Sequence, residues 1–174
     1  MKWKYPEFIV DCEWLQDHNG EQNLRIYDCT TYLHFTDEDP LKPYDVESGF
    51  LNYQAAHIPN ASFLDLQEDL SDVNSEYKFT LPGLEDLWDR LQSKGVGEPY
   101  HIILYSANGP HWAARIWWMI YVTGYRRVSV LDGGFQEWQR LNYPVEAGYK
   151  KFGLAKFKLN PNHQIFVSKD EVLS

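Results

Sequence analysis

Three short apolar runs, each bounded by polar or turn-forming residues, stand out along the chain. They extend from Leu24 to Asp28, from His101 to Ser106 and from Arg126 to Asp132. Short, continuously apolar runs of this kind are typical of strands in a parallel sheet that is covered on both faces. The pattern therefore predicts three buried strands.

Two segments between and beside these runs have the spacing of helices. The first places four large apolar residues on one helical face and is followed by a glycine, which suits a helix end. The second, from Ala113 to Val122, is apolar on nearly all sides and predicts a helix buried against the sheet, with Trp117, Trp118 and Met119 in the core rather than around a ligand. The face of the first helix consists of Leu84, Leu87, Trp88 and Leu91, and the glycine is Gly95.

The remaining segments are less regular. From Thr36 to Tyr53 the chain is polar and acidic, with Pro40 and Pro43, and predicts a long loop with at most one short helix. Residues 56–66 regain an ordered pattern that ends in a strand. After Pro144 the pattern loosens again, and residues 165–174 have the pattern of a strand followed by the start of a helix.

Strands that alternate with helices predict an α/β fold, and 174 residues suit one domain with some chain left over. We expect a central, mostly parallel five-stranded sheet with helices on both faces. The predicted domain covers residues 1–148. Residues 149–174 are expected to form a linker and the start of a second domain, or a C-terminal tail.

Composition narrows the classes of function. Hydrophobic residues make up 44% of the chain and aromatic residues 16%, as in a globular domain with a core. A net charge of −9 argues against nucleic acid as a partner. Neither a signal peptide nor a membrane span is predicted, which favours a cytosolic protein without a membrane partner.

The chain has two cysteines, Cys12 and Cys29, in segments predicted to be buried. Their spacing matches no zinc or redox pair, so we expect two reduced thiols in the core. Neither a metal ion nor another cofactor is expected.

Two further motifs carry a resemblance to a known family. The run VLDGGFQEW, from Val130 to Trp138, followed by Tyr143, Pro144 and Val145, resembles the C-terminal signature of rhodanese-like domains. The run AHIPNASFLDL, from Ala56 to Leu66, resembles their other signature, GHIPGA. Together with the strand that ends at Asp28, these motifs cover most of residues 8–147 in the family's order, and they imply the rhodanese-like α/β fold.

In active rhodaneses, a strand that ends in Tyr-Cys leads into a loop of the type C-x-x-G-x-R or C-x-x-G-x-T, and then into a helix. The loop's backbone N–H groups lower the pKa of the thiol and hold the bound persulfide. The matching stretch here has serine in place of that cysteine, and serine cannot form a persulfide. It reads Ser106, Ala107, Asn108, Gly109, Pro110 and His111, so the family's loop glycine is kept, proline removes one N–H group, and histidine replaces Arg or Thr. We therefore expect no catalytic residue in this chain.

The continuation AARIWWM, from Ala113 to Met119, resembles the N-terminal halves of tandem thiosulfate and 3-mercaptopyruvate sulfurtransferases. The resemblance implies a non-catalytic domain whose partner is a second rhodanese-like domain, expected in the same full-length chain. In those enzymes the second domain carries the catalytic cysteine. By that match, His111 and Trp112 would border the partner domain's cleft, and we expect Trp112 to be partly exposed.

Other readings of these residues remain open. The degenerate loop of a regulatory module would recognise an anion or a protein without turnover. A hydrolase triad of Ser106, His57 and Asp28 lacks the G-x-S-x-G motif, and a related phosphatase would need cysteine at 106. His57 is expected to be structural, and Asp132 to be the N-terminal cap of a helix.

Overall fold

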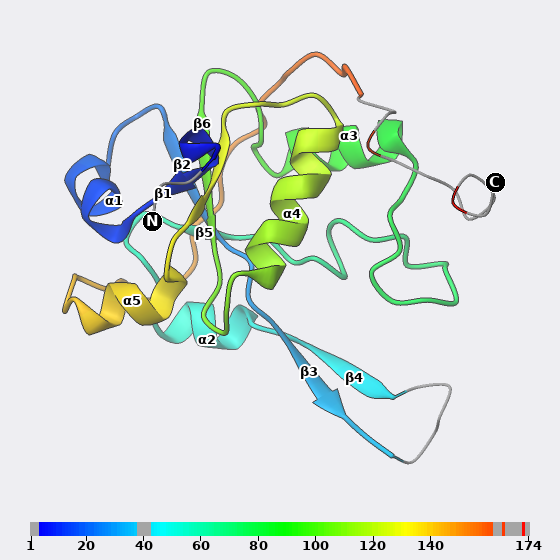
Figure 1. Ribbon diagram of the computed structural model, residues 1–174, viewed down its shortest axis with the longest axis horizontal. Helices are drawn as coiled ribbons and strands as arrows, with labels where there is room; N and C mark the ends of the chain where they lie inside the picture. Colours follow the sequence, from blue (N-terminus) through cyan, green and yellow to red (C-terminus); the bar gives the residue numbers. More distant parts are fainter. Residues whose placement is uncertain (1–3, 38–42, 162–164, 166–171, 173–174) are drawn as a thin grey trace.

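A parallel five-stranded sheet forms the centre of the molecule (Figure 1). The computed structural model describes residues 4–37, 43–161, 165 and 172. The fold and the three predicted strands, which are the central ones, are confirmed. The spatial order is β1 (Ile9–Val10), β7 (Val128–Leu131), β6 (His101–Tyr105), β2 (Leu24–Asp28) and β5 (Ser62–Phe63), with every pair parallel.

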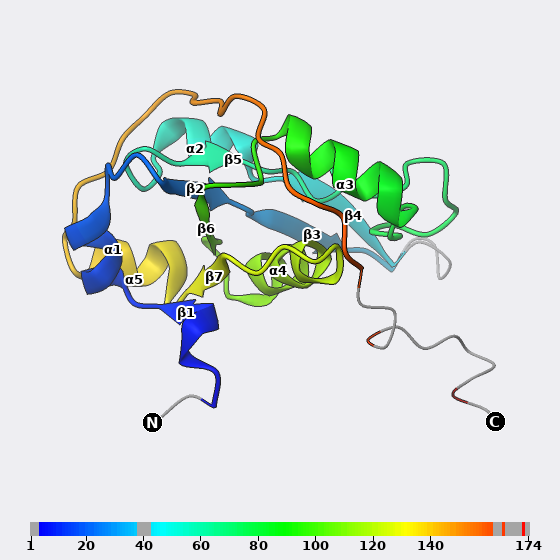
Figure 2. The same ribbon diagram turned by 90° about the horizontal axis from the view of Figure 1, so that it is seen from above.

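Helices cover both faces of this sheet, as Figure 2 shows from above. Successive side chains of a strand point to opposite faces, so β6 sends Ile103 and Tyr105 to one core and Ile102 and Leu104 to the other. A short 3₁₀ helix, Pro6–Phe8, precedes β1. The first core is closed by α1 (Cys12–His18), α2 (Phe50–Ala55) and α5 (Gly134–Arg140), and the second by α3 (Leu84–Ser93) and α4 (His111–Val122).

Helix α4 confirms the prediction for the apolar segment, although it begins two residues earlier than the pattern indicated. Met119 is fully buried, and Trp117 and Trp118 are partly buried against the same core. The ring of Trp117 stacks on Tyr121 with 4.9 Å between centroids. These residues are therefore packing residues, as expected.

The turn from β7 into α5 requires glycine. Gly133 and Gly134 have φ values of +75° and +55°, which side chains rarely adopt. A Cβ atom at Gly134 would also lie 2.4 Å from the carbonyl oxygen of Ser106. Asp132 precedes this turn, and no side chain caps α5, so the prediction of an Asp132 cap is wrong.

The prediction of a long loop from Thr36 to Tyr53 is wrong in part. Its second half contains strand β4 (Tyr44–Ser48), which pairs antiparallel with β3 (Thr31–Phe35), and the start of α2. This hairpin extends away from the body of the molecule (Figure 1). Exposure alternates along β4, as in a ribbon with one face partly covered, whereas along β3 it increases from buried Thr31 to exposed Phe35.

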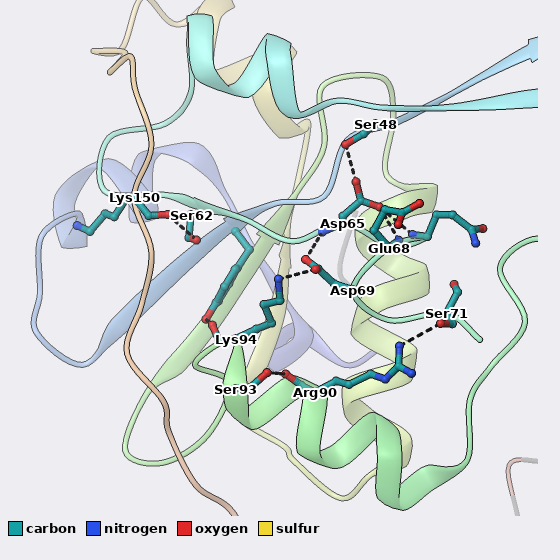
Figure 3. A network of polar contacts seen from close by, with 12 residues as sticks. Ser48, Ser62, Asp65, Glu68, Asp69, Ser71, Arg90, Ser93, Lys94 and Lys150 are labelled. Atoms are coloured by element: carbon teal, nitrogen blue, oxygen red, sulfur yellow. Dashed lines mark hydrogen bonds and ion pairs between the residues drawn. The ribbon is translucent and has the colours of Figure 1, made fainter. Parts of the chain in front are cut away.

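Polar contacts anchor the base of the hairpin (Figure 3). The Ser48 hydroxyl donates to the Asp65 carboxylate, and that residue's backbone N–H donates to Asp69 at 3.1 Å. Asp69 in turn forms an ion pair with Lys94, at the end of α3. The network joins the hairpin to the helix that covers the second core.

The segment that follows α5 passes from the α5 side of the sheet to the α3 side (Figure 2). Its backbone pairs with the main body, since Glu98 N donates to Lys156 O at 2.9 Å. Phe157 is 7% exposed, contacts the rings of Trp88 and Tyr125, and accepts a hydrogen bond from Trp88 Nε1 at 2.9 Å. Residues 149–161 thus pack on the domain, and the predicted elements within residues 165–174 lie outside the described residues except at two positions.

Within the described residues, no helix is long and apolar enough to cross a membrane.

We predict that Phe157→Ala lowers the free energy of unfolding by about 3 to 5 kcal/mol, because it empties a buried aromatic site. Leu154→Ala, three residues earlier and 64% exposed, is the matched control and should change stability little. Urea unfolding of both variants tests this. Equal stability of the two variants would show that the segment is not part of the core.

Candidate functional site

The candidate site is the loop that follows β6 at the carboxyl end of the sheet. In open α/β sheets this edge is where ligands usually bind. Ser106 is 3% exposed, and its hydroxyl donates to the carbonyl oxygen of Gly109 at 2.6 Å. Gly109 has a φ of +112°, so the loop turns there through a conformation that favours glycine. The loop is closed on itself by this bond.

Neighbouring strands hold the loop from the side. The backbone N–H of Ala107 donates to Thr30 Oγ1 at 2.9 Å, and the Asn108 side chain donates to Thr31 O at 2.7 Å. The N–H of Phe135 donates to Ser106 O at 3.2 Å from the other side. The N–H of Ala107 is therefore used by Thr30 and is not available to a ligand in the loop.

Asp28 lies behind this loop, at the end of β2, and is 2% exposed. Its carboxylate accepts hydrogen bonds from the N–H and the hydroxyl of Thr30. Burial raises the pKa of Asp28, although hydrogen bonds with Thr30 and Tyr105 act in the opposite direction. Burial also raises the pKa of Tyr105 well above its usual value, and its hydroxyl accepts from Ile58 N at 3.2 Å. These groups form a buried polar support that the sequence motifs did not reveal, apart from the place of Asp28 at a strand end.

Helix α4 starts directly after the loop. Pro110 and His111 are exposed, whereas Trp112 is only 8% exposed and its ring contacts Phe79 with 5.3 Å between centroids. The prediction of an exposed Trp112 is wrong, because the helix turns this side chain into the core on the same face as Ile116. The indole Nε1–H has no hydrogen-bond partner among the described residues. That His111 and Trp112 border the cleft of a partner domain stays a prediction. Of the two residues, only His111 is accessible in this structure.

Neither cysteine lies in the loop. Cys29 is fully buried, and burial raises its pKa well above the usual value. Cys12 is 2% exposed at the start of α1, and its pKa is raised to about 11, mainly by burial and further by nearby carboxylates, of which Glu137 has the largest effect. Both thiols are free and buried, as the sequence predicted. At neutral pH neither is a thiolate, which is the form that reacts.

The side chains of the hypothetical hydrolase triad are each bonded elsewhere. His57 is 1% exposed, its Nδ1 lies 2.7 Å from Tyr53 O, and its ring stacks on Tyr53. Ser106 is bonded to Gly109 and Asp28 to Thr30. The structure therefore supports the structural reading of His57. No group of three or more metal-ligating side chains occurs among the described residues.

Two adjoining hollows flank the exposed side of the loop and share Ile9, Pro110 and Val130. One has a volume of about 370 Å³ and continues under the loop toward the glycine turn. The other, of about 390 Å³, is almost wholly apolar and has Lys4 at its margin. We call the second one the α4 groove. Its further lining residues are Tyr5, Phe8, Ala114 and Trp117.

Comparison with known proteins agrees with this geometry. The profile of the rhodanese-like domain matches residues 11–141. Thiosulfate sulfurtransferase of Rattus norvegicus is 35% identical over 171 residues, which cover 95% of this chain and 54% of the relative. 3-Mercaptopyruvate sulfurtransferase of Homo sapiens is 31% identical over 156 residues, covering 86% of this chain and 49% of the relative. The chain thus spans about half the length of these curated relatives.

Solved structures show the same fold. The crystal structure of a 3-mercaptopyruvate sulfotransferase from Escherichia coli superposes with a TM-score of 0.79 and 28% identity, over 95% of this chain and 60% of that one. The 3-mercaptopyruvate sulfurtransferase from Leishmania major gives a TM-score of 0.72 over 93% of this chain, at 23% identity. With the signature motifs, the parallel sheet and the profile match in agreement, this chain belongs to the family of rhodanese-like domains.

Proposed function

We propose that this chain is the supporting, non-catalytic domain of a thiosulfate or 3-mercaptopyruvate sulfurtransferase. In this proposal the reactive cysteine belongs to a second rhodanese-like domain of a longer protein. The lengths of the relatives support it, since two full sulfurtransferases are about twice the length that this chain covers.

The observation that carries the proposal is the bond between the Ser106 hydroxyl and the Gly109 carbonyl oxygen. Sulfur transfer by a rhodanese-like loop needs a thiolate surrounded by N–H donors. Here the central side chain is a hydroxyl, and the group 2.6 Å from it is a carbonyl oxygen, which repels negative charge. Pro110 removes a further N–H group. The loop therefore has the wrong atoms for a persulfide.

The same carbonyl oxygen weighs against the alternative of an anion-binding module at this loop. An anion beside Ser106 would meet the Gly109 oxygen instead of a nest of N–H donors. Recognition of a protein surface fits better, because Pro110, His111 and Ala114 are exposed beside the apolar α4 groove. We assign this surface to the second domain. The cytosolic location stays a prediction, and one plant relative is named as mitochondrial.

Three predictions follow from the proposed function, and the first concerns thiol reactivity. In the folded chain, iodoacetamide should label Cys12 and Cys29 far more slowly at pH 7.5 than in the unfolded chain. Because the pKa of Cys12 is raised to about 11, its thiolate fraction and labelling rate should increase about tenfold per pH unit up to that value. Mass spectrometry of timed samples measures this. Rapid labelling of either cysteine at neutral pH would contradict the structural role.

The second prediction concerns activity. The isolated chain should transfer no sulfur from thiosulfate to cyanide above a blank. Ser106→Cys should also be inactive, because its thiol would lie beside the Gly109 oxygen, which raises the thiol pKa. A colorimetric thiocyanate assay of both proteins tests this. Turnover by Ser106→Cys would show that the loop can support sulfur transfer and lacks only the cysteine nucleophile.

The third prediction concerns docking in the longer protein. Ala114→Asp places a carboxylate beside the α4 groove, at a cost of about 3 kcal/mol if a second domain covers it. It should lower sulfurtransferase activity and separate the unfolding of the two domains, while the isolated chain keeps its stability. The matched control is Ala147→Asp, at an exposed alanine outside the groove. Equal behaviour of the two variants would exclude the groove from the interface.

A further inference from the structure

We infer that another pocket, at the opposite end of the sheet from Ser106, binds a small oxyanion between Arg25 and Lys150. The pocket has a volume of about 240 Å³ and lies where β2 begins. Since the strands are parallel, this amino end is remote from the loop after β6, so the inference does not depend on the proposed function. The lining includes Gly20, Glu21, Gln22, Leu24, Asn60, Tyr100 and Phe152 as well as the two cations.

Arg25 is a buried cation whose hydrogen-bond partners are neutral. It is 7% exposed, and its Nη1 donates to the carbonyl oxygens of Gly95 and Gly153, the latter at 2.9 Å. The Tyr27 hydroxyl is a further neutral neighbour. Across the described part of the chain, the ion pairs involve other residues. Buried charges are normally compensated by an opposite charge, and none of the described carboxylates supplies it to this guanidinium.

Aromatic rings hold the guanidinium in place. Its central carbon lies 3.5 Å from the centroid of Tyr100 and 5.0 Å from that of Phe152. Such contacts orient the plane of the guanidinium. Nη1 bonds two carbonyl oxygens, and the Tyr27 hydroxyl is a further hydrogen-bonding neighbour of this guanidinium. A guanidinium has five N–H donors, and no carboxylate of the described residues pairs with this one, so two donors remain for the oxygens of an oxyanion.

Lys150 brings a second cation to the same ring. Its Nζ lies 5.7 Å from the centroid of Phe152 and donates to the Asn60 side-chain oxygen at 2.9 Å, which is again a neutral partner. The backbone of Lys150 is fixed, because its carbonyl accepts from Ser62 Oγ at 2.8 Å (Figure 3) and its N–H donates to Tyr53 Oη at 3.0 Å. The Lys150 side chain therefore lies in the pocket lining on a backbone that is fixed by hydrogen bonds.

Two positive charges that share one ring repel each other, in a protein whose net charge is −9. The pocket lining contains a single carboxylate, that of Glu21, for these two cations. An oxyanion with two or more oxygens, such as sulfate or phosphate, would bond the fork of Arg25 and the ammonium of Lys150 together. The pocket, with a volume of about 240 Å³, has room for such a small anion.

The competing explanation is that Arg25 only clamps the segment around Gly153 to the domain through carbonyl oxygens. Clamping needs Arg25 but makes no use of the charge of Lys150. The two explanations therefore differ in the effect of Lys150→Gln, which keeps the backbone bonds and a polar side chain while removing the charge.

The experiment is a titration of the isolated chain with sodium sulfate, followed by amide chemical shifts, with sodium chloride adjusted to hold the ionic strength constant. We expect saturable shifts at Gln22, Asn60 and Phe152. Lys150→Gln should weaken the apparent affinity by about tenfold, the effect of losing one charge-assisted hydrogen bond. Lys151→Gln, its exposed neighbour, should bind like the unmodified chain.

Arg25→Lys serves as a second variant, because it keeps the positive charge and removes the fork. It should also weaken sulfate binding, while its spectrum shows whether the fold is retained. Shifts that do not saturate, or equal affinities for Lys150→Gln and Lys151→Gln, would overturn the inference. The absence of any saturable shift would leave Arg25 with the clamping role alone.

Discussion

The hydrogen bond from the Ser106 hydroxyl to the Gly109 carbonyl oxygen governs what the loop after β6 can do. A rhodanese-like loop works by surrounding one sulfur atom with N–H donors at a helix start. In this chain the serine donates into the loop, and a carbonyl oxygen fills the position that faces it. The helix start, the glycine and the parallel sheet are all present. In the proposed function, this serine and the carbonyl oxygen replace the electropositive centre of an active loop.

The surroundings of the loop agree with that assignment. Asp28 and Thr30 bond to each other, and Thr30 accepts the N–H of Ala107, so these groups are satisfied within the protein. Beside them, Asn108 Oδ1 and Trp112 Nε1 are buried without a hydrogen-bond partner among the described residues. Burial raises the pKa of Asp28, which disfavours a negative charge behind the loop. Such buried hydrogen bonds fix the conformation of the loop after β6 and of the surface that it forms. Its exposed side, with Pro110, His111 and the α4 groove, offers packing area in place of reactive groups.

Much of the fold could be predicted from the sequence, because its central strands and helices follow from local patterns of apolar and polar residues. Continuous apolar runs predicted the central strands, and the apolar segment from Ala113 to Val122 predicted α4. The β3–β4 hairpin was missed because its strands carry charges such as Asp45 and Glu47 and lie near two prolines, which favour a loop reading. Its stability depends on tertiary contacts at its base, for example between Ser48 and Asp65, that no local pattern reveals.

The candidate site also combines features that the sequence predicts with features that depend on tertiary structure. Ser106 and its loop were found by position in a motif, whereas the bond to Gly109 depends on loop conformation. Trp112 was expected on the surface as a loop residue, yet its spacing of four from Ile116 places both on the buried face of α4. The Arg25 and Lys150 pocket brings together residues 125 positions apart, as their numbers in the sequence show. Only the fold places them on one aromatic ring.

The most direct test of the central claim is whether the isolated chain can carry sulfur at all. After incubation with thiosulfate or 3-mercaptopyruvate, intact-protein and peptide mass spectrometry under non-reducing conditions would detect an added sulfur atom on a cysteine. The account predicts none on Cys12 or Cys29 in the folded chain, because both thiols are buried and their pKa values are raised. A stoichiometric persulfide on either cysteine would contradict the claim that this domain is non-catalytic.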